Sequence, residues 1–211
     1  MSKIKRVIAG LGLVTGFGVA MLPMTAFADD PTPAVGESVI TANINEVIGM
    51  RLVSSGSAGN KTLECNSGEN PNCTGQTQLV STTILPGQDD KTSMYTDVYV
   101  STNSINGYNL TLIDADAYNA LRTTGGDAIN AIATEPVGTT NPGWAVSITG
   151  KSGWFMVPVS TGSAIDVKTL QPSPAAVTIE DHTKVTYGVA ATSSQPSGIY
   201  TDTVVYTATA R

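Results

Sequence analysis

The 211-residue sequence predicts an all-β protein, an antiparallel β-sandwich of the Greek-key, Ig-like or jelly-roll type. Short runs rich in Val, Thr and Tyr recur with period-2 alternation, and turn residues separate them at intervals of about a dozen positions. Only Ala115–Ile132 has a helix-like composition, and two glycines interrupt it. We therefore expect about ten to twelve strands, with one or two short helical turns in a crossover loop.

Residues 1–28 have the pattern of an export signal. Three basic residues precede an apolar run, Val7–Met24, and small residues follow it, which predicts cleavage between Ala28 and Asp29. An uncleaved membrane anchor is the alternative interpretation. Cleavage would leave a flexible leader at 29–36 and a single β-sandwich domain at 37–211. No later stretch approaches the ~20 apolar residues that span a bilayer, so no membrane span is expected after cleavage.

The composition predicts an extracellular protein. The signal contains three of the eleven Lys and Arg and none of the seventeen Asp and Glu, which leaves eight basic and seventeen acidic residues, a net charge of −9. This charge opposes binding to phosphate backbones, so nucleic acid is not an expected partner. Few charges together with many Thr, Ser, Gly and Asn residues are typical of secreted β-proteins, and we expect a location at the cell surface or cell wall.

The first half of the domain contains three predicted strands and a long loop. The alternating segments Glu37–Ile44 and Glu46–Val53 predict two strands, and Gln76–Leu85 predicts a third. Ser54–Gly75 has no periodicity and is rich in Gly, so we expect irregular structure there.

In the second half, two hairpins are predicted. Met94–Asp114 alternates on both sides of an Asn-Gly turn, and Val185–Ala210 does so on both sides of a Ser-Ser-Gln-Pro-Ser-Gly turn. Trp144–Thr149 and Gly153–Val159 predict two more strands between the hairpins. The last strand of the sequence is long and has no fully charged face, so we expect it to lie inside a sheet.

Cys65 and Cys73 are the only cysteines, and they lie inside the predicted loop. In an exported chain this predicts a disulfide, which would contribute about 2 to 3 kcal/mol in the chain-entropy model. A metal site is the alternative, but the single His is far away and the chain has no further Cys.

No arrangement of residues predicts catalysis, a metal or a cofactor. His182 follows Asp181 in a polar segment that predicts a turn, but no Ser lies in a G-x-S-x-G pattern, so a solvated loop His is expected. Asp114 with Asp116, and likewise the Asp89-Asp90 pair, could bind Ca²⁺ or act as acid and base. Turn caps or surface charges are the simpler interpretation, since neither pair continues as an EF-hand loop.

Trp144 and Trp154 each follow a Gly. Both can fill the space between two sheets, whereas an exposed Trp beside Gly could stack on a sugar ring.

Two segments resemble the WxL cell-surface domain of Gram-positive bacteria. Gly143-Trp144-Ala145-Val146 is similar to its Gly-Trp-x-Leu segment, with Val in place of Leu. The segment from Tyr200 to Ala208 is similar to its distal Tyr-x-x-x-Leu-Thr-Trp-x-Leu strand, with Val205, Tyr206 and Ala208 in place of Thr, Trp and Leu. The resemblance implies a β-sandwich held noncovalently at the cell wall. Together with the possible sugar stacking of the two tryptophans, it makes Trp144, Trp154, Tyr200 and Tyr206 the candidate wall- or glycan-binding residues.

Three functions are open. The first is a nonenzymatic cell-surface protein that binds a cell-wall polymer or glycan and has an adhesion or coat role. The second is a pilin-like subunit that self-associates when the leader adds a strand to a neighbour's sheet. The third is a secreted hydrolase that uses a carboxylate pair such as Asp114 and Asp116.

Overall fold

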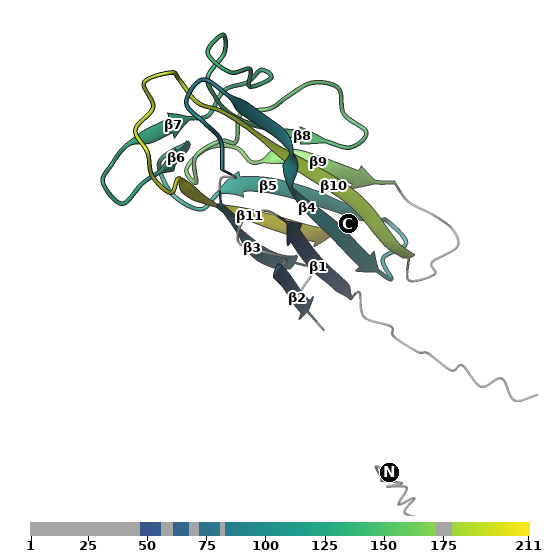
Figure 1. Cartoon of the computed structure of the whole chain (residues 1–211). Coiled ribbons are helices and arrows are strands. Elements are labelled where there is room, and N and C mark those ends of the chain that lie inside the picture. Colours follow the sequence, from purple (N-terminus) through teal and green to yellow (C-terminus); the bar gives the residue numbers. More distant parts are fainter. Residues whose placement is uncertain (1–46, 56–60, 68–71, 81–82, 172–178) are drawn as a thin grey trace, which may run out of the picture. The chain divides into compact units, whose positions relative to one another are not determined.

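The computed structural model describes residues 47–55, 61–67, 72–80, 83–171 and 179–211, and in these ranges the chain is all-β (Figure 1). They form eleven strands in two antiparallel sheets and contain no helix. The described residues therefore contain no helix that could span a bilayer. The export signal, the leader and the predicted strand Glu37–Ile44 lie outside the described residues.

Sheet A has the strand order β2-β1-β4-β10-β8. The central strand β4 is fourteen residues long and pairs with β1 and β10, which supply one neighbour on each edge. From Met94 onward buried and partly exposed residues alternate along β4, as the sequence predicted. The strands are β1 (Ile48–Ser55), β2 (Lys61–Ser67), β4 (Asp89–Thr102), β8 (Gly143–Ile148) and β10 (Ile179–Ala190).

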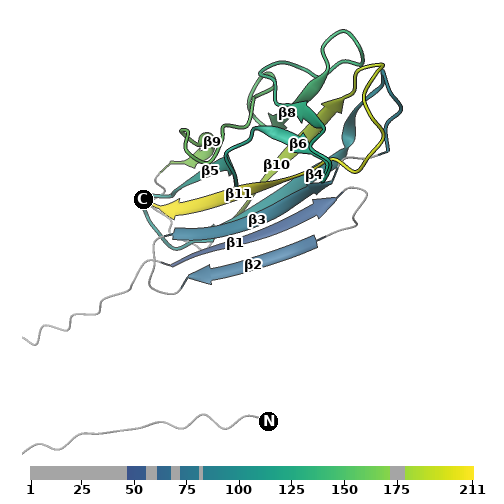
Figure 2. The same cartoon turned by 90° about the vertical axis from the view of Figure 1, so that its left-hand side faces the viewer.

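Sheet B has β11 at its centre (Figure 2). β3 pairs with one edge of β11 between Thr201 and Thr209, and β5 pairs with the other edge from Val204 to Ala210. The prediction that the last strand lies inside a sheet is confirmed, and the even-numbered residues 202 to 208 are buried as its alternation indicated. The strands are β3 (Asn72–Val80), β5 (Tyr108–Asp114), β6 (Ala120–Arg122), β7 (Ala128–Asn130), β9 (Ile165–Leu170) and β11 (Thr201–Ala210).

Both predicted hairpins are wrong. β4 and β5 flank the Asn106-Gly107 turn, but β4 pairs within sheet A and β5 within sheet B. β10 and β11 flank the other predicted turn and also belong to different sheets. Turn residues specify that the chain changes direction, but not which strand becomes the neighbour. Here both turns carry the chain from one sheet to the other.

The predicted helical turns are also wrong. β6 and β7 occupy that segment and pair with each other around a turn at Gly125-Gly126. The residues on each side of the two glycines are too few to form a stable helix alone, whereas pairing β6 with β7 buries Leu121 and Ile129.

Two further predictions are wrong. The segment Ser54–Gly75, expected to be irregular, contains β2 and the start of β3. β2 pairs with β1, which directly precedes it, but its segment has no alternation that would reveal a strand, and β3 pairs with the distant β11. Gly153–Val159, expected to be a strand, makes only one isolated bridge, between Phe155 and Val146.

Side chains from both sheets form one buried hydrophobic cluster, to which β4 contributes Val98 and Val100 and β5 contributes Leu110 and Leu112. A row of four hydroxyl groups runs through the buried region. Ser54 Oγ lies 2.9 Å from Thr96 Oγ1, Thr96 Oγ1 lies 2.8 Å from the Tyr187 hydroxyl, and the Tyr187 hydroxyl lies 2.6 Å from that of Tyr206. The last contact joins sheet A to sheet B.

A second polar contact between the sheets lies at Asp181 of β10. Its carboxylate accepts hydrogen bonds from the Tyr108 hydroxyl of β5 at 2.6 Å and from Lys168 Nζ of β9 at 2.7 Å. Burial acts to raise the pKa of Asp181, but hydrogen bonds from Lys168 and Tyr108 outweigh it and leave the pKa below its ordinary value.

Candidate functional site

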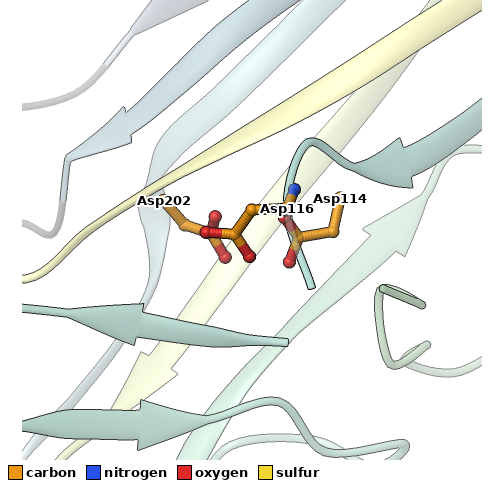
Figure 3. A group of neighbouring side chains, drawn as sticks. All are labelled: Asp114, Asp116 and Asp202. Atoms are coloured by element: carbon orange, nitrogen blue, oxygen red, sulfur yellow. The ribbon is translucent and has the colours of Figure 1, made fainter. Parts of the chain in front are cut away.

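Three carboxylates meet at the end of β5 and the start of β11 (Figure 3). Asp114 is the last residue of β5, Asp116 follows it in the next loop, and Asp202 is the second residue of β11. Because Val204 pairs with Asp114, Asp202 is the diagonal neighbour of Asp114 on the same buried face. One oxygen from each of the three carboxylates lies within 4.8 Å of the other two.

One oxygen of each carboxylate accepts a hydrogen bond from a nearby backbone N–H group. Asp114 Oδ1 accepts the Asp116 N–H at 3.0 Å, Asp116 Oδ1 accepts the Tyr118 N–H at 2.6 Å, and Asp202 Oδ1 accepts the Thr203 N–H at 2.6 Å. The second oxygen, Oδ2, of Asp114 and of Asp202 is buried and has no hydrogen-bond partner among the described residues. Asp114 is 0% exposed and Asp202 is 8% exposed.

The cluster concentrates negative charge away from solvent. Burial raises the pKa of Asp202 to about 8, and the charge of Asp114 adds to this shift. Burial also raises the pKa of Asp114, and although the Asp116 N–H opposes that shift, the Asp116 charge adds to it. Buried carboxylates are normally protonated, paired with a positive group or bound to a metal. At neutral pH the cluster is therefore suited to hold either a proton or a cation.

A cavity of about 450 Å³ lies beside the cluster. β3 occupies one edge of β11, so β5 and β6 share the other edge, with β5 paired from Val204 onward and β6 paired at Thr201. The cavity lies where one partner strand replaces the other. Its lining consists of hydroxyl, carboxylate, guanidinium and methyl groups, from Thr123, Thr124, Thr201, Thr203, Asp116, Asp202, Arg122, Ala115 and Ala120.

An exposed aromatic ring lies beside this cavity. Tyr118 is 59% exposed, and the guanidinium carbon of Arg122, a lining residue, lies 4.2 Å from the centre of its ring. This cation–π contact restricts the orientation of the ring. A sugar can place its apolar face against such a ring while its hydroxyls bond to neighbouring polar groups. The arrangement can therefore bind a carbohydrate.

The aromatic residues singled out by the sequence lie elsewhere, and most of them are buried. Trp144, Tyr200 and Tyr206 are 1%, 5% and 0% exposed, so their rings are not accessible to a ligand in this structure. Trp144 thus fits the core interpretation. Trp154 is half-buried and lies against Gly188, where an added Cβ would be 2.6 Å from Trp154 Cζ3.

The two cysteines lie in strands of different sheets. In sheet A Cys65 of β2 pairs with Met50, and in sheet B Cys73 of β3 pairs with Ala208. Cys73 is 2% exposed, whereas the Cys65 side chain is outside what the structure describes. The disulfide stays a prediction, and it would connect sheet A to sheet B.

His182 lies in β10 and not in a loop. Its Nε2 is 2.8 Å from Asp97 Oδ1, and its ring stacks on Tyr99 with the ring centres 4.7 Å apart. The side chain is 48% exposed. This is the environment of a surface His with a carboxylate partner.

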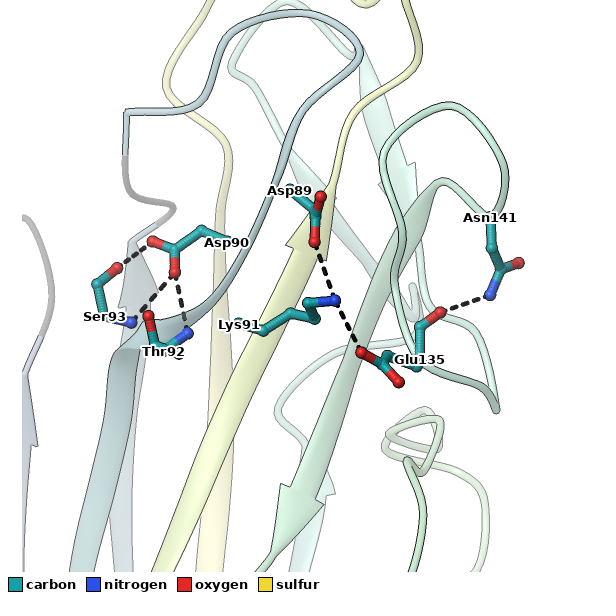
Figure 4. A network of polar contacts seen from close by, with 7 residues as sticks. All are labelled: Asp89, Asp90, Lys91, Thr92, Ser93, Glu135 and Asn141. Carbon is teal, nitrogen blue, oxygen red and sulfur yellow. Dashed lines mark hydrogen bonds and ion pairs between the residues drawn. The ribbon is translucent and has the colours of Figure 1, made fainter.

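The pair Asp89 and Asp90 does not form a joint site (Figure 4). Asp89 forms an ion pair with Lys91 at 3.1 Å, and Lys91 also contacts Glu135 at 2.7 Å. Asp90 instead accepts hydrogen bonds from the backbone N–H groups of Thr92 and Ser93 and from the Ser93 hydroxyl. These two carboxylates act as an ion-pair partner and a turn cap, the simpler of the two interpretations made from the sequence.

Comparisons of the chain with protein-family models, with curated proteins and with solved structures find no match. The resemblance to the WxL domain therefore stays a prediction. The first of its two segments lies in β8, at the edge of sheet A, and the second overlaps β11, at the centre of sheet B.

Two of the three clustered carboxylates, Asp114 and Asp116, are candidates from the sequence alone, whereas Asp202 is not. Asp114 and Asp116 are near neighbours in sequence, whereas Asp202 joins them only through the pairing of β11 with β5. The available signal was a charged residue on the apolar face of an alternating strand, because a buried carboxylate there needs a partner. Tyr118 was missed because its segment was predicted to be helical.

Proposed function

We propose that this is an exported, nonenzymatic β-sandwich protein of the cell surface that binds a cell-wall polymer or glycan noncovalently, in an adhesion or coat role. The signal-like N-terminal segment and the Thr-rich, weakly charged composition support the location. The buried cluster that draws on both sheets supports a sandwich in which the sheets pack face to face.

The observation that carries the proposal is the polar cavity with Tyr118 beside it. Four Thr hydroxyls and the guanidinium of Arg122 can bond to sugar hydroxyls, and the exposed ring can contact the apolar face of a sugar. The net charge of −9 for residues 29–211 opposes binding to a strongly anionic polymer. A neutral or weakly charged glycan is therefore the favoured ligand.

The position of the carboxylates favours binding over hydrolysis. Asp114 is fully buried and does not line the cavity, so it cannot contact a substrate there. A hydrolase that used Asp114 and Asp116 as its acid and base would need both within reach of the scissile bond.

The test is sedimentation of purified protein, residues 29–211, with isolated cell walls, together with a glycan array. Tyr118→Ala is expected to weaken binding about tenfold, which corresponds to about 1.4 kcal/mol. Tyr99→Ala is the matched control, because Tyr99 also lies under an arginine, Arg51 at 3.8 Å, but is in sheet A. No sedimentation and no array signal would contradict the proposal, as would an equal loss in both variants.

Fractionation of native cells tests the location. Recovery from the wall by salt, as a protein that starts at Asp29, agrees with the proposal. Recovery as high-mass, detergent-resistant assemblies would favour the pilin-like alternative instead.

A further inference from the structure

We propose that Asp114, Asp116 and Asp202 bind one Ca²⁺ ion. The geometry permits a single ion, because oxygens from all three carboxylates lie within 4.8 Å of one another. Two oxygens bound to the same Ca²⁺ at about 2.4 Å can be at most about 4.8 Å apart. Three oxygens spread evenly in a plane around one Ca²⁺ at this distance are about 4.2 Å apart, so small side-chain movements would let one ion contact all three side chains.

A second, independent observation points to a ligand. Asp114 and Asp202 are each more than nine-tenths buried, and the Oδ2 atom of each has no hydrogen-bond partner among the described residues. Both side chains belong to the group whose oxygens converge (Figure 3). A buried carboxylate oxygen without a donor is costly, and these oxygens can be satisfied either by a proton shared between Asp114 and Asp202 or by a cation, which would satisfy both atoms at once.

The donor atoms favour Ca²⁺ over other divalent ions. All three groups supply oxygen, whereas Zn²⁺ is usually bound through nitrogen or sulfur. Mg²⁺ requires distances of about 2.0 to 2.1 Å and near-ideal octahedral geometry, so its ligands span a smaller space. Ca²⁺ takes six to eight oxygens, and because Asp116 and Asp202 line the cavity, water and the neighbouring Thr201 and Thr203 can supply the rest.

The ion would connect two parts of the chain that are distant in sequence. Asp114 and Asp116 belong to the end of β5 and its following loop, and Asp202 belongs to β11. Asp116 also accepts the N–H of Tyr118, so bound Ca²⁺ would restrain the loop that carries this ring. The site itself does not depend on the proposed glycan binding.

The test is thermal unfolding of residues 29–211 after removal of metal with EDTA, measured in EDTA, in Ca²⁺ and in Mg²⁺. At a hundredfold excess over its Kd, Ca²⁺ is expected to raise the Tm of the natural protein by about 5 °C or more. Asp202→Asn should lose this shift. Asp127→Asn is the matched control, because Asp127 is an exposed carboxylate outside the cluster, and it should keep the full shift.

Asp116→Asn keeps the test decisive if Asp202→Asn does not fold, because Asp116 is exposed. Calorimetric titration with Ca²⁺ should then show an affinity at least tenfold weaker in a protein with a natural circular dichroism spectrum. The proposal is overturned if millimolar Ca²⁺ does not raise the Tm of the wild-type protein, or if Mg²⁺ raises it equally. It is also overturned if the folded Asp202→Asn or Asp116→Asn variant binds Ca²⁺ and gains stability as the wild-type protein does. Failure of glycan binding would leave this readout unchanged.

Discussion

Replacing Tyr187 by Phe is expected to destabilise the protein about twice as much as replacing Tyr206 by Phe. The Tyr187 hydroxyl lies between two others, 2.8 Å from Thr96 Oγ1 and 2.6 Å from the Tyr206 hydroxyl. Burial raises the pKa of Tyr187 to about 12 and that of Tyr206 well above its usual value, so both hydroxyls stay protonated at neutral pH. Each can therefore donate a hydrogen bond.

The magnitude follows from the hydrogen bonds that each change removes. A buried hydrogen bond contributes about 1 kcal/mol net, and Phe keeps the shape of the ring, so no large cavity forms. Tyr206→Phe removes its bond to Tyr187, about 1 kcal/mol, and Tyr187→Phe removes two bonds, about 2 kcal/mol. The double variant also loses only these two bonds, so it should cost about 1 kcal/mol less than the sum of the single changes.

The assay is urea unfolding of residues 29–211 at neutral pH, with the free energy of unfolding obtained by linear extrapolation. Tyr95→Phe is the control, because Tyr95 is half-buried and lies under Lys184, and it should change stability by less than about 0.5 kcal/mol. If the losses in free energy of the two single variants add up to that of the double variant, the two hydroxyl groups are not coupled as described. A larger loss for Tyr206→Phe than for Tyr187→Phe would also contradict the hydrogen-bonded row.

Gly188→Ala places a Cβ 2.6 Å from the Trp154 ring, so we expect a loss of about 1 to 3 kcal/mol and a changed Trp fluorescence spectrum; an unchanged spectrum and Tm would contradict this packing. The lowered pKa of Asp181 stabilises the fold above the pKa of an unfolded Asp, about 3.9, and this contribution is lost as the pH falls through the folded pKa. Asp181→Asn should therefore flatten the acid side of the stability curve, and a curve of unchanged shape would count against it. Peptide mapping without reduction should recover Cys65 and Cys73 joined, whereas alkylation of both thiols without reductant would exclude the disulfide.

The positions of most strands could be predicted because burial imposes alternation locally. The alternating runs in β4, β5 and β11 are visible in the sequence, and the buried residues follow them. Pairing is a property of distant segments, and so both predicted hairpins failed although the turns between their strands exist. β2 was missed although its partner β1 directly precedes it, because its segment shows no periodicity.

The candidate site shows the same division. Two residues of the acidic cluster are near neighbours in sequence, and the third joins them only through the register of β11 against β5. The burial of Trp144 was the favoured one of two alternatives in the sequence, because an aromatic residue beside Gly can suit either a core or a surface. Its 1% exposure in the fold decides between them.

The position of β11 has a consequence for the order of folding. β3, β5 and β6 all pair with β11, yet it follows every other strand in the sequence. Sheet B cannot be completed while this segment is still being synthesised, and its formation requires the closure of very long loops, which slows folding. Transport through a secretion channel requires an open chain. If the protein is exported as we propose, the dependence of sheet B on β11 would keep this part of the chain unfolded until its last strand has been synthesised.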